Sequence, residues 1–420
     1  MNSRIAFLFS TLVIFLISAS ISASNDGGNE TDYQALLKFK SMISNEEGLS
    51  SWNSSFHFCD WSGVSCGKQN NKRVTALVLE SRGLHGSLSP YVGNLSFLHV
   101  FSLRNNNIQG MIPHEIGRLS RLRFLYLGSN KISGVIPTNL FHCSNLKDLG
   151  LYANKLVRSI PKEISFLSKL TYLSVYDNNL TGGIPPILGN ITSMELFSAT
   201  RNPLGGSIPD TLGNWKILTE FYSGACNLSG IIPHSIYNLS LLTNLSSPVN
   251  QLTGSLPSAI GEMLPHLEFL QLRGNKLTGP IPPSISNCSK LKFLELMDNN
   301  FRGKLKIDFA KLKDIYFVSL GNNIYGFGEA DDMKFIDTLK NCSRIKVLHL
   351  SNCTFQGVLP TSIDAIGNLS LLTGLWLTSN RLEGHIPSSL GNCHHRLELH
   401  LDDIINSVEK YLLNFFNLHL

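Results

Sequence analysis

Residues 101–113 read FSLRNNNIQGMIP and carry the frame on which most of this chain is built. The frame has apolar residues at its first, third and eighth positions, an asparagine at its sixth, a glycine at its tenth, and Ile-Pro at its end. With small variations it returns over residues 125–137, 149–161 and 173–185, each time 24 residues further along. The asparagine position, called the slot below, falls at residues 82 (an arginine), 106, 130, 154, 178, 202, 226 (a cysteine), 250, 275, 299, 323, 353 (a cysteine) and 380.

A fixed period of this length is the sequence signature of a leucine-rich-repeat solenoid. The first and third positions of the frame point to the same side of a strand, because side chains alternate along it. The frame therefore predicts an α/β repeat solenoid that buries its leucines beneath a parallel sheet on the concave side. A solenoid builds one long surface from neighbouring coils. This favours recognition of a partner over catalysis.

The composition excludes several classes of protein. Charged residues make up 15% of the chain and hydrophobic residues 43%, which argues against a disordered chain. The formal net charge is +5, a small excess that looks scattered along the sequence. Nucleic acid is therefore not expected as a partner.

Residues 1–24 have the features of a secretory signal peptide. Arg4 supplies the positive start, residues 5–17 are an apolar run, and small residues follow to residue 24. The run is short for a membrane helix, which needs about 20 apolar residues. No later stretch is longer, so we expect no membrane segment in this chain and an exported, extracellular protein.

Residues 25–73 differ in kind from the repeats and predict an N-terminal cap. Residues 32–40 have apolar positions at helical spacing. Cys59 and Cys66 follow, and in an exported protein this pair favours a disulfide over a metal site. The first coil of a solenoid exposes an apolar edge. A helix, two tryptophans and a disulfide make a suitable cover for it.

Residues 74–393 are predicted to form about 13 coils, with an insert at residues 324–341. The insert is interpreted as a longer loop on the convex side, or alternatively as a partner contact. The slot asparagines are expected to bond to backbone groups of adjacent coils. Cys226 and Cys353 would mimic that donor weakly, and Cys143, Cys288, Cys342 and Cys393 would be buried free thiols. Residues 394–420 suggest a capping helix or, preferably, the product of a truncated gene.

These segments together resemble the ectodomains of plant leucine-rich-repeat receptor kinases, especially the subgroup that senses microbial peptides or proteins. The resemblance covers about residues 30–390 and rests on residues 32–40, Trp52-Asn53, residues 59–66 (CDWSGVSC) and the Gly-x-Ile-Pro frame. It implies a ligand-recognition module for plant defence or development, with a receptor kinase or co-receptor as a further partner. Members of this family carry a membrane helix and a kinase, and neither is found in this sequence. We therefore expect no enzyme activity, no cofactor and no metal.

The concave strand positions supply candidate ligand-binding residues. Aromatic residues gather on three neighbouring strands, where they could make the large contacts typical of interfaces. A second group lies further along, although aromatic residues also stabilise sheets by pairing across strands. The first group is Phe124, Tyr126, Tyr152, Tyr172 and Tyr176, and the second is Tyr222, Phe269, Arg273, Phe293 and Glu295.

Twelve Asn-x-Ser/Thr sequons offer acceptors for N-linked glycans. The expected sites are Asn94, Asn190, Asn238, Asn287 and Asn368, of which the first four each lie 12 residues past a slot, off the concave strand. Asn244 lies on a concave strand, where a glycan would divide the binding face.

Two alternative functions remain open at this stage. One is a secreted inhibitor of cell-wall-degrading enzymes, since polygalacturonase-inhibiting proteins are also short solenoids of this repeat. The other is a truncated receptor product with no function of its own. If the chain is a fragment of a full receptor, its place is the cell membrane instead of the space outside the cell.

Overall fold

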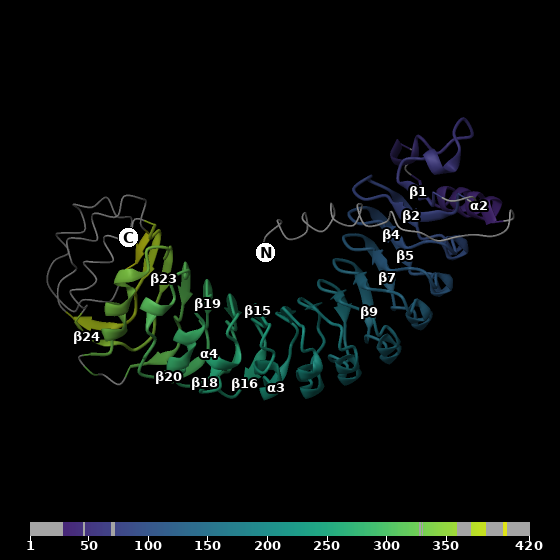
Figure 1. Cartoon of the computed structure of the whole chain (residues 1–420). Coiled ribbons are helices and arrows are strands. Elements are labelled where there is room, and N and C mark those ends of the chain that lie inside the picture. Colours follow the sequence, from purple (N-terminus) through teal and green to yellow (C-terminus); the bar gives the residue numbers. More distant parts are fainter. Residues whose placement is uncertain are drawn as a thin grey trace.

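The computed structural model describes residues 28–44, 47–68, 72–326, 329, 331–358, 371–383 and 398–400. The predicted signal peptide, Asn368, Cys393 and most of the predicted tail lie outside these residues. The coils stack along an arc, with the strands β15, β19 and β23 on its inner side and the short helix α3 on its outer side (Figure 1). This is the predicted leucine-rich-repeat solenoid, and the predicted fold class is confirmed.

A 15-stranded sheet runs through the described residues and forms the concave face. Its first pair is antiparallel and all later pairs are parallel, with the first residues of β6, β8 and β10 aligned. Its strands are β1 (Val64–Cys66), β2 (Val74–Val78), β4 (Val100–Ser102), β6 (Phe124–Tyr126), β8 (Asp148–Gly150), β10 (Tyr172–Ser174), β12 (Leu196–Ser198), β13 (Glu220–Tyr222), β15 (Asn244–Ser246), β17 (Phe269–Gln271), β19 (Phe293–Glu295), β21 (Phe317–Ser319), β23 (Val347–His349), β25 (Gly374–Trp376) and β27 (Glu398–His400).

Shorter parallel sheets follow the slots on a second side of the coils. The longest of them stops after β11, where Pro203 follows the slot and has no N–H to donate. Their strands are β3 (His85–Ser87), β5 (Asn107–Met111), β7 (Lys131–Gly134), β9 (Lys155–Arg158), β11 (Asn179–Leu180), β14 (Ser229–Ile231), β16 (Gln251–Thr253), β18 (Thr278–Gly279), β20 (Asn300–Gly303), β22 (Ile324–Tyr325), β24 (Gln356–Val358) and β26 (Arg381–Glu383).

Short helices return the chain over the convex side after each Ile-Pro step. In many coils the proline caps a five-residue 3-10 helix whose middle residue is buried, as Ile116 is. The helices are α2 (Gly28–Lys40), η1 (Glu47–Leu49), η2 (Phe58–Asp60), η3 (Pro90–Asn94), η4 (His114–Arg118), η5 (Thr138–His142), η6 (Lys162–Phe166), η7 (Pro186–Asn190), η8 (Asp210–Asn214), α3 (His234–Tyr237), α4 (Ile260–Met263), η9 (Pro283–Asn287), η10 (Phe309–Lys311) and η11 (Lys334–Asn341). None of the helices in the described residues is long and apolar enough to cross a membrane.

The slot asparagines form the predicted ladder. Asn202 is 1% exposed, and its Nδ2 donates to the carbonyl oxygens of Val175 and Ala199, each at 2.9 Å. Its Oδ1 accepts from the backbone N–H of Leu180 at 2.9 Å. Each asparagine thus joins its own coil to the coil before it. The same bonds recur at Asn106, Asn130, Asn154, Asn178, Asn250, Asn275, Asn299, Asn323 and Asn380.

A cysteine in the slot supplies the hydrogen-bond donor of asparagine but not its acceptor. The Cys226 thiol donates to the Ala199 carbonyl at 3.2 Å, as predicted for a weak substitute. A thiol offers no oxygen to accept from the N–H of Leu204, the group that an asparagine at this slot would bond. That N–H bonds instead to the carbonyl of Asn202 at 2.7 Å. The described free cysteines, 143, 226, 288, 342 and 353, are all buried, as predicted. Burial raises the pKa of the Cys143 thiol to about 12.

The N-terminal cap has the predicted helix, tryptophans and Cys59–Cys66 disulfide. Trp52 and Trp61 are buried and stack with ring centroids 5.1 Å apart. The Asp32 carboxylate pairs with Arg73 at 2.8 Å and accepts from the Val74 N–H at 2.8 Å, which joins the cap helix to β2. The predicted boundary at residue 73 stays a prediction.

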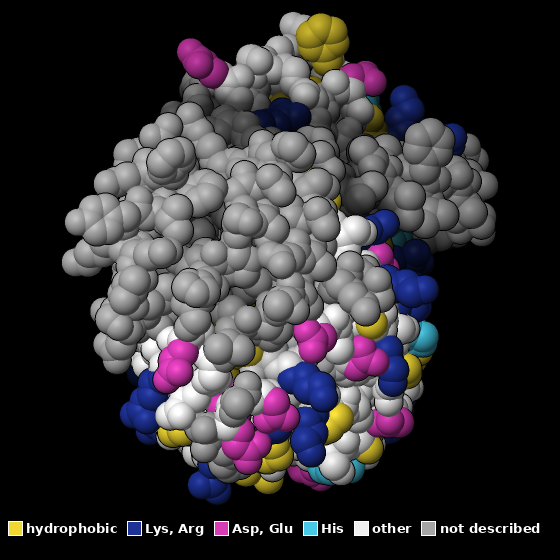
Figure 2. Space-filling model, turned by 90° about the vertical axis from the view of Figure 1, so that its left-hand side faces the viewer, with side chains coloured by type: hydrophobic (Ala, Val, Ile, Leu, Met, Phe, Trp, Pro, Cys, Tyr) yellow, Lys and Arg dark blue, Asp and Glu magenta, His cyan; other side chains and the backbone are white. Residues whose placement is uncertain are grey.

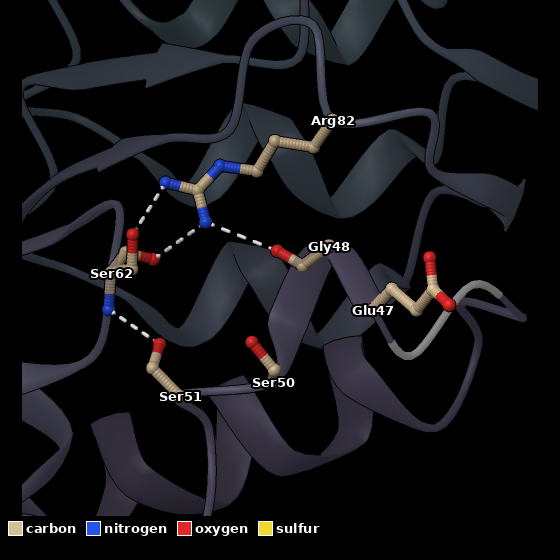
Figure 3. A pocket seen from close by; sticks show the side chains of 6 residues that line it. All are labelled: Glu47, Gly48, Ser50, Ser51, Ser62 and Arg82. Atoms are coloured by element: carbon tan, nitrogen blue, oxygen red, sulfur yellow. Dashed lines mark hydrogen bonds between the residues drawn. The ribbon is translucent and has the colours of Figure 1, made fainter.

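Arg82, which occupies the first slot, also ties the cap to the solenoid. Its guanidinium donates to the carbonyl oxygens of Gly48 and Ser62 at 3.1 and 3.2 Å, and to the Ser62 hydroxyl at 2.8 Å (Figure 3). A shallow, open pocket of about 450 Å³ lies here, lined also by Glu47, Ser50 and Ser51. The donors of Arg82 point to groups of the cap, so we assign this pocket to the cap junction.

The insert contributes to the hydrophobic core. Met333, Phe335 and Ile336 are buried around the start of η11. The Phe335 ring lies 6.3 Å from that of Phe309 and 5.8 Å from that of Phe355. This packing favours the structural interpretation of the insert over a partner contact.

Asn202→Ala is expected to lower the free energy of unfolding by about 3 kcal/mol, because buried backbone groups of two coils lose their partners. Asn202→Cys should cost less, since a thiol keeps the donor, as Cys226 does. Chemical denaturation of both variants checks this. Equal losses would contradict the role given to the hydrogen bonds.

Val249 occupies a strained backbone position. Its φ is +55° and its side chain is 61% exposed, so neither packing nor burial compensates for the strain. A left-handed conformation costs about 1–2 kcal/mol for most side chains and least for glycine and asparagine. Val249→Asn is therefore expected to raise the free energy of unfolding by about 1 kcal/mol. The matched control is Val135→Asn at an exposed position without positive φ. An equal gain in the control would refute the assignment of strain.

Candidate ligand-binding face

The concave sheet is the candidate binding face because one of its sides lacks a covering layer in the described residues. Parallel sheets are usually covered on both sides. In β6, Leu125 points into the core and is 0% exposed, whereas Phe124 and Tyr126 on the other side are half-buried. Half-buried aromatic residues on an uncovered sheet offer apolar area together with polar tips.

The first predicted group comes together on adjacent coils. Tyr152 and Tyr176 stack with centroids 4.8 Å apart and planes within 7° of parallel. The Tyr126 hydroxyl donates to the Asp148 carboxylate at 2.6 Å, and Tyr172 aligns with Asp148 on the next strand. All five predicted aromatics are half-buried on the concave side.

Two glycines make room for these rings. A Cβ on Gly128 would meet ring atoms of Tyr152 at 2.5–2.7 Å, so Tyr152 lies back over the preceding coil. A Cβ on Gly150 would meet Tyr126 at 3.1 Å, so Tyr126 leans toward the following coil. The two tyrosines therefore lie over positions where the neighbouring coils have no side chain.

Polar residues of the two preceding coils, Glu80 and Arg104, lie next to this group on its N-terminal side. The Glu80 carboxylate accepts two bonds from Arg104 at 3.0 and 3.1 Å, and the Arg104 guanidinium lies 4.8 Å from the Tyr126 ring centroid. Burial, with the Asp148 charge second, raises the pKa of Tyr126. Burial, with Tyr152 beside it, raises the pKa of Tyr176 to about 12. At neutral pH both phenols are protonated, and the Tyr126 hydroxyl already donates to Asp148.

The second predicted group is divided. The Tyr222 hydroxyl donates to Glu220 at 2.6 Å and accepts from the Asn244 Nδ2 at 2.7 Å. Further along, the Phe269 and Phe293 rings lie 6.2 Å apart and Arg273 pairs with Asp298 at 2.9 Å. Glu295 accepts from Gln271 at 3.5 Å, and burial raises the pKa of its carboxyl. Tyr222 therefore belongs to a polar cluster separate from the two phenylalanines.

Sequence reasoning missed several members of the face. Phe317 stacks on Phe293 at 4.1 Å, and the Trp376 ring lies 5.6 Å from that of His349 and 5.8 Å from that of His400. All four occupy the same frame positions as the residues that were selected, so a complete reading of the frame would have found them. Arg104 and Glu80 could also have been found in this way, but their contact with Tyr126 could not.

The predicted glycan acceptors described in the structure lie away from the concave sheet. Asn94, Asn190 and Asn287 end the helices η3, η7 and η9, and Asn238 follows α3. Asn244 instead uses its amide nitrogen to bond Tyr222 on the face itself. Whether these sequons carry glycans stays a prediction.

Two kinds of segment in this chain match known protein families. Residues 29–67 match the leucine rich repeat N-terminal domain. Residues 97–119, 121–143, 169–191, 266–288, 344–366 and 371–393 match the leucine rich repeat.

Curated relatives of the matched region are plant receptor kinases. The LRR receptor-like serine/threonine-protein kinase EFR of Arabidopsis thaliana is 43% identical over 110 residues, which are 26% of this chain and 10% of that protein. The receptor kinase-like protein Xa21 of Oryza sativa subsp. japonica is 44% identical over 90 residues, 20% of this chain and 9% of that protein. The chain thus matches only about a tenth of the length of these relatives.

Solved structures of plant receptor ectodomains have the same fold. The plant peptide hormone receptor RGFR1, solved in complex with RGF2, has a TM-score of 0.62 and 28% identity over 76% of this chain and 57% of that chain. The HAESA ectodomain of Arabidopsis, solved with an IDA peptide hormone ligand, has a TM-score of 0.53 and 26% identity over 90% of this chain and 82% of that chain.

Gly128→Ala is expected to push the Tyr152 ring off its neighbour, since the new Cβ would meet three ring atoms below 3.0 Å. The ring-current shifts between Tyr152 and Tyr176 should then change in NMR spectra of ring-labelled tyrosine. Gly67→Ala is the control, because its Cβ would meet nothing closer than 3.7 Å. Unchanged tyrosine signals in Gly128→Ala would disprove the close contact.

Proposed function

This chain is a leucine-rich-repeat solenoid that resembles plant receptor ectodomains, and we propose that its concave sheet binds a peptide or protein ligand outside the cell. The observation that carries the proposal is the aromatic group on β6, β8 and β10 and in the residues after them. Phe124, Tyr126, Tyr152, Tyr172 and Tyr176 lie together on a sheet face that the described chain leaves uncovered.

The chemistry of this group suits a peptide. Tyrosine is rigid and amphipathic, so it loses little conformational entropy on binding and offers both ring and hydroxyl. Tyr126 and Tyr152 are held in place by Asp148, Arg104 and neighbouring rings. A pre-organised surface binds more tightly because less ordering is needed. Two solved neighbours, RGFR1 and HAESA, were captured with peptide ligands.

The location and the wider role form the second part of the proposal. The Cys59–Cys66 disulfide is a bond that persists in oxidising compartments and is rare in the cytosol. We therefore place the protein outside the cell, where it recognises its ligand in plant immunity or development. A receptor kinase or co-receptor would be its signalling partner, and the solenoid itself has a binding role only.

Tyr126→Ala combined with Tyr152→Ala should weaken ligand binding by about 30-fold or more, the loss of about 2 kcal/mol expected for aromatic hot spots. Peptides selected from a random display library on the purified chain would serve as ligands, with affinities measured by calorimetry. The matched control replaces Phe56 and Tyr91, two exposed aromatic residues off the concave sheet, with alanine. Equal affinities for the tyrosine variant and the native chain, or equal losses in both variants, would refute the proposal.

A further inference from the structure

The positive charge of this chain is concentrated on the same coils as the aromatic group. Residues 114–171 contain nine lysine and arginine residues and three acidic residues, a net of +6 against +5 for the whole chain. The sequence alone made this excess look scattered. Folding by the repeat frame stacks it on successive coils.

Four of these cations lie at the edge where the strands of the concave sheet begin. We call Arg121, Arg123, Lys147 and Lys169 the basic flank. Arg123 directly precedes β6 and Lys147 directly precedes β8, and the Lys147 N–H bonds to the Arg123 carbonyl at 2.8 Å. Neighbouring strands lie about 4.8 Å apart. The flank therefore spans three coils, roughly 10 Å along the solenoid.

Contacts from the neighbouring coils orient two of the charges. The Arg121 guanidinium lies 3.8 Å from the Phe97 ring centroid, and Arg73 covers the same ring at 4.5 Å. Arg73 pairs with Asp32, whereas Arg121 has no acidic partner among the described residues and its buried Nη1 makes no hydrogen bond to them. Lys169 donates to the Asn145 side chain at 2.7 Å, a neutral partner.

Among the described residues, the acidic groups near the flank are Glu115, Asp148 and Glu195, the last of which directly precedes β12. Glu115 lies beside His114 at 3.2 Å. Asp148 accepts hydrogen bonds from Tyr126 and Thr171. No basic-flank residue makes a salt bridge with any described residue. The flank also acts on His99, whose pKa is lowered by burial and then by Arg123 and Arg121.

The later coils show the opposite arrangement. Lys292 pairs with Glu268 at 2.6 Å, and Arg344 pairs with Asp314 at 2.7 Å. Figure 2 shows basic and acidic side chains side by side at this end of the molecule. Arg273 and Lys304 also have acidic partners there. No such ion pair is found for the basic flank among the described residues.

The sequons leave the flank open as well. Residues 95–178 contain no Asn-x-Ser/Thr sequence, and the nearest sequons are Asn94 before this range and Asn179, in β11, after it. Glycans at those two positions would lie off the strand starts that carry the flank.

We propose that the basic flank binds an acidic stretch of the ligand, an extended peptide segment with two or three Asp or Glu residues within about four residues. The length follows from the roughly 10 Å span and about 3.3 Å per extended residue. The inference rests on the proposed function and deepens it, since the flank adjoins the tyrosines of the concave face. Carboxylates at the edge and apolar side chains over the rings are together the chemistry of a peptide.

The test compares two labelled peptides by fluorescence anisotropy with the purified chain. One alternates Glu with Tyr and the other alternates Gln with Tyr. The Glu peptide should bind about tenfold more tightly or better, because several exposed charge pairs each add a modest gain. Raising the ionic strength from about 0.1 M to about 1 M should shrink the difference, since screening shortens from roughly 10 Å to roughly 3 Å.

The decisive variant carries Arg121→Gln, Arg123→Gln, Lys147→Gln and Lys169→Gln, and it should bind both peptides equally. The matched control removes four exposed charges elsewhere, through Lys216→Gln, Lys290→Gln, Lys311→Gln and Lys313→Gln, and should keep the preference for Glu. Circular dichroism would confirm that both variants fold. A preference that survives in the flank variant, or disappears in both variants, overturns the proposal.

Two further measurements separate the competing explanations. If oligogalacturonate binds as tightly as the Glu peptide and through the same four residues, the flank is a site for an acidic polysaccharide and the peptide proposal is wrong. Tyr126→Ala with Tyr152→Ala should weaken both peptides alike. No effect of the tyrosines together with an effect of the flank would refute the concave-face function and leave the flank as a separate site.

Discussion

The fold depends on one repeated demand, the hydrogen bonding of buried backbone groups at the turn that follows each concave strand. The chain leaves the strand there, so carbonyl and N–H groups of two coils would be unpaired inside the protein. Asn202 satisfies three of them at 2.9 Å and fixes the distance between its coil and the preceding one. Repetition of this contact aligns the strands, and aligned parallel strands create the concave face.

Sequence positions that bury leucine or fill the slot tolerate few residue types, whereas the positions between them tolerate many. Leu125 and Leu149 are almost fully buried, and the slots accept asparagine or a partial substitute such as Cys226. The other residues of the same strands range in size from Gly150 to Tyr126. A small residue on one coil creates space for a large ring on the next. The proposed binding surface therefore consists of residues whose substitution costs the fold little stability.

This division explains what the sequence could predict. The frame identified the solenoid, the asparagine ladder and the side of each strand, because all three follow from a strict period. The disulfide followed from the cysteine pair in a cap. The lean of Tyr152 over Gly128 could not be predicted, since a period assigns a face but no rotamer. The basic flank could not be predicted from the net charge, because Arg121 and Lys169 are far apart in sequence and come to neighbouring coils only in the folded chain.

The flank and the tyrosines would contribute different properties to one interface. Exposed charges add little affinity each, but they steer a ligand of opposite charge and fix its direction. Partly buried rings contribute most of the contact energy and depend little on salt. A ligand that alternates acidic and apolar residues would therefore place its carboxylates on Arg123 and Lys147 and its apolar residues on Tyr126 and Tyr152. Scrambling the order of the same residues would abolish this match while leaving the ligand's charge unchanged, so specificity would reside in sequence order.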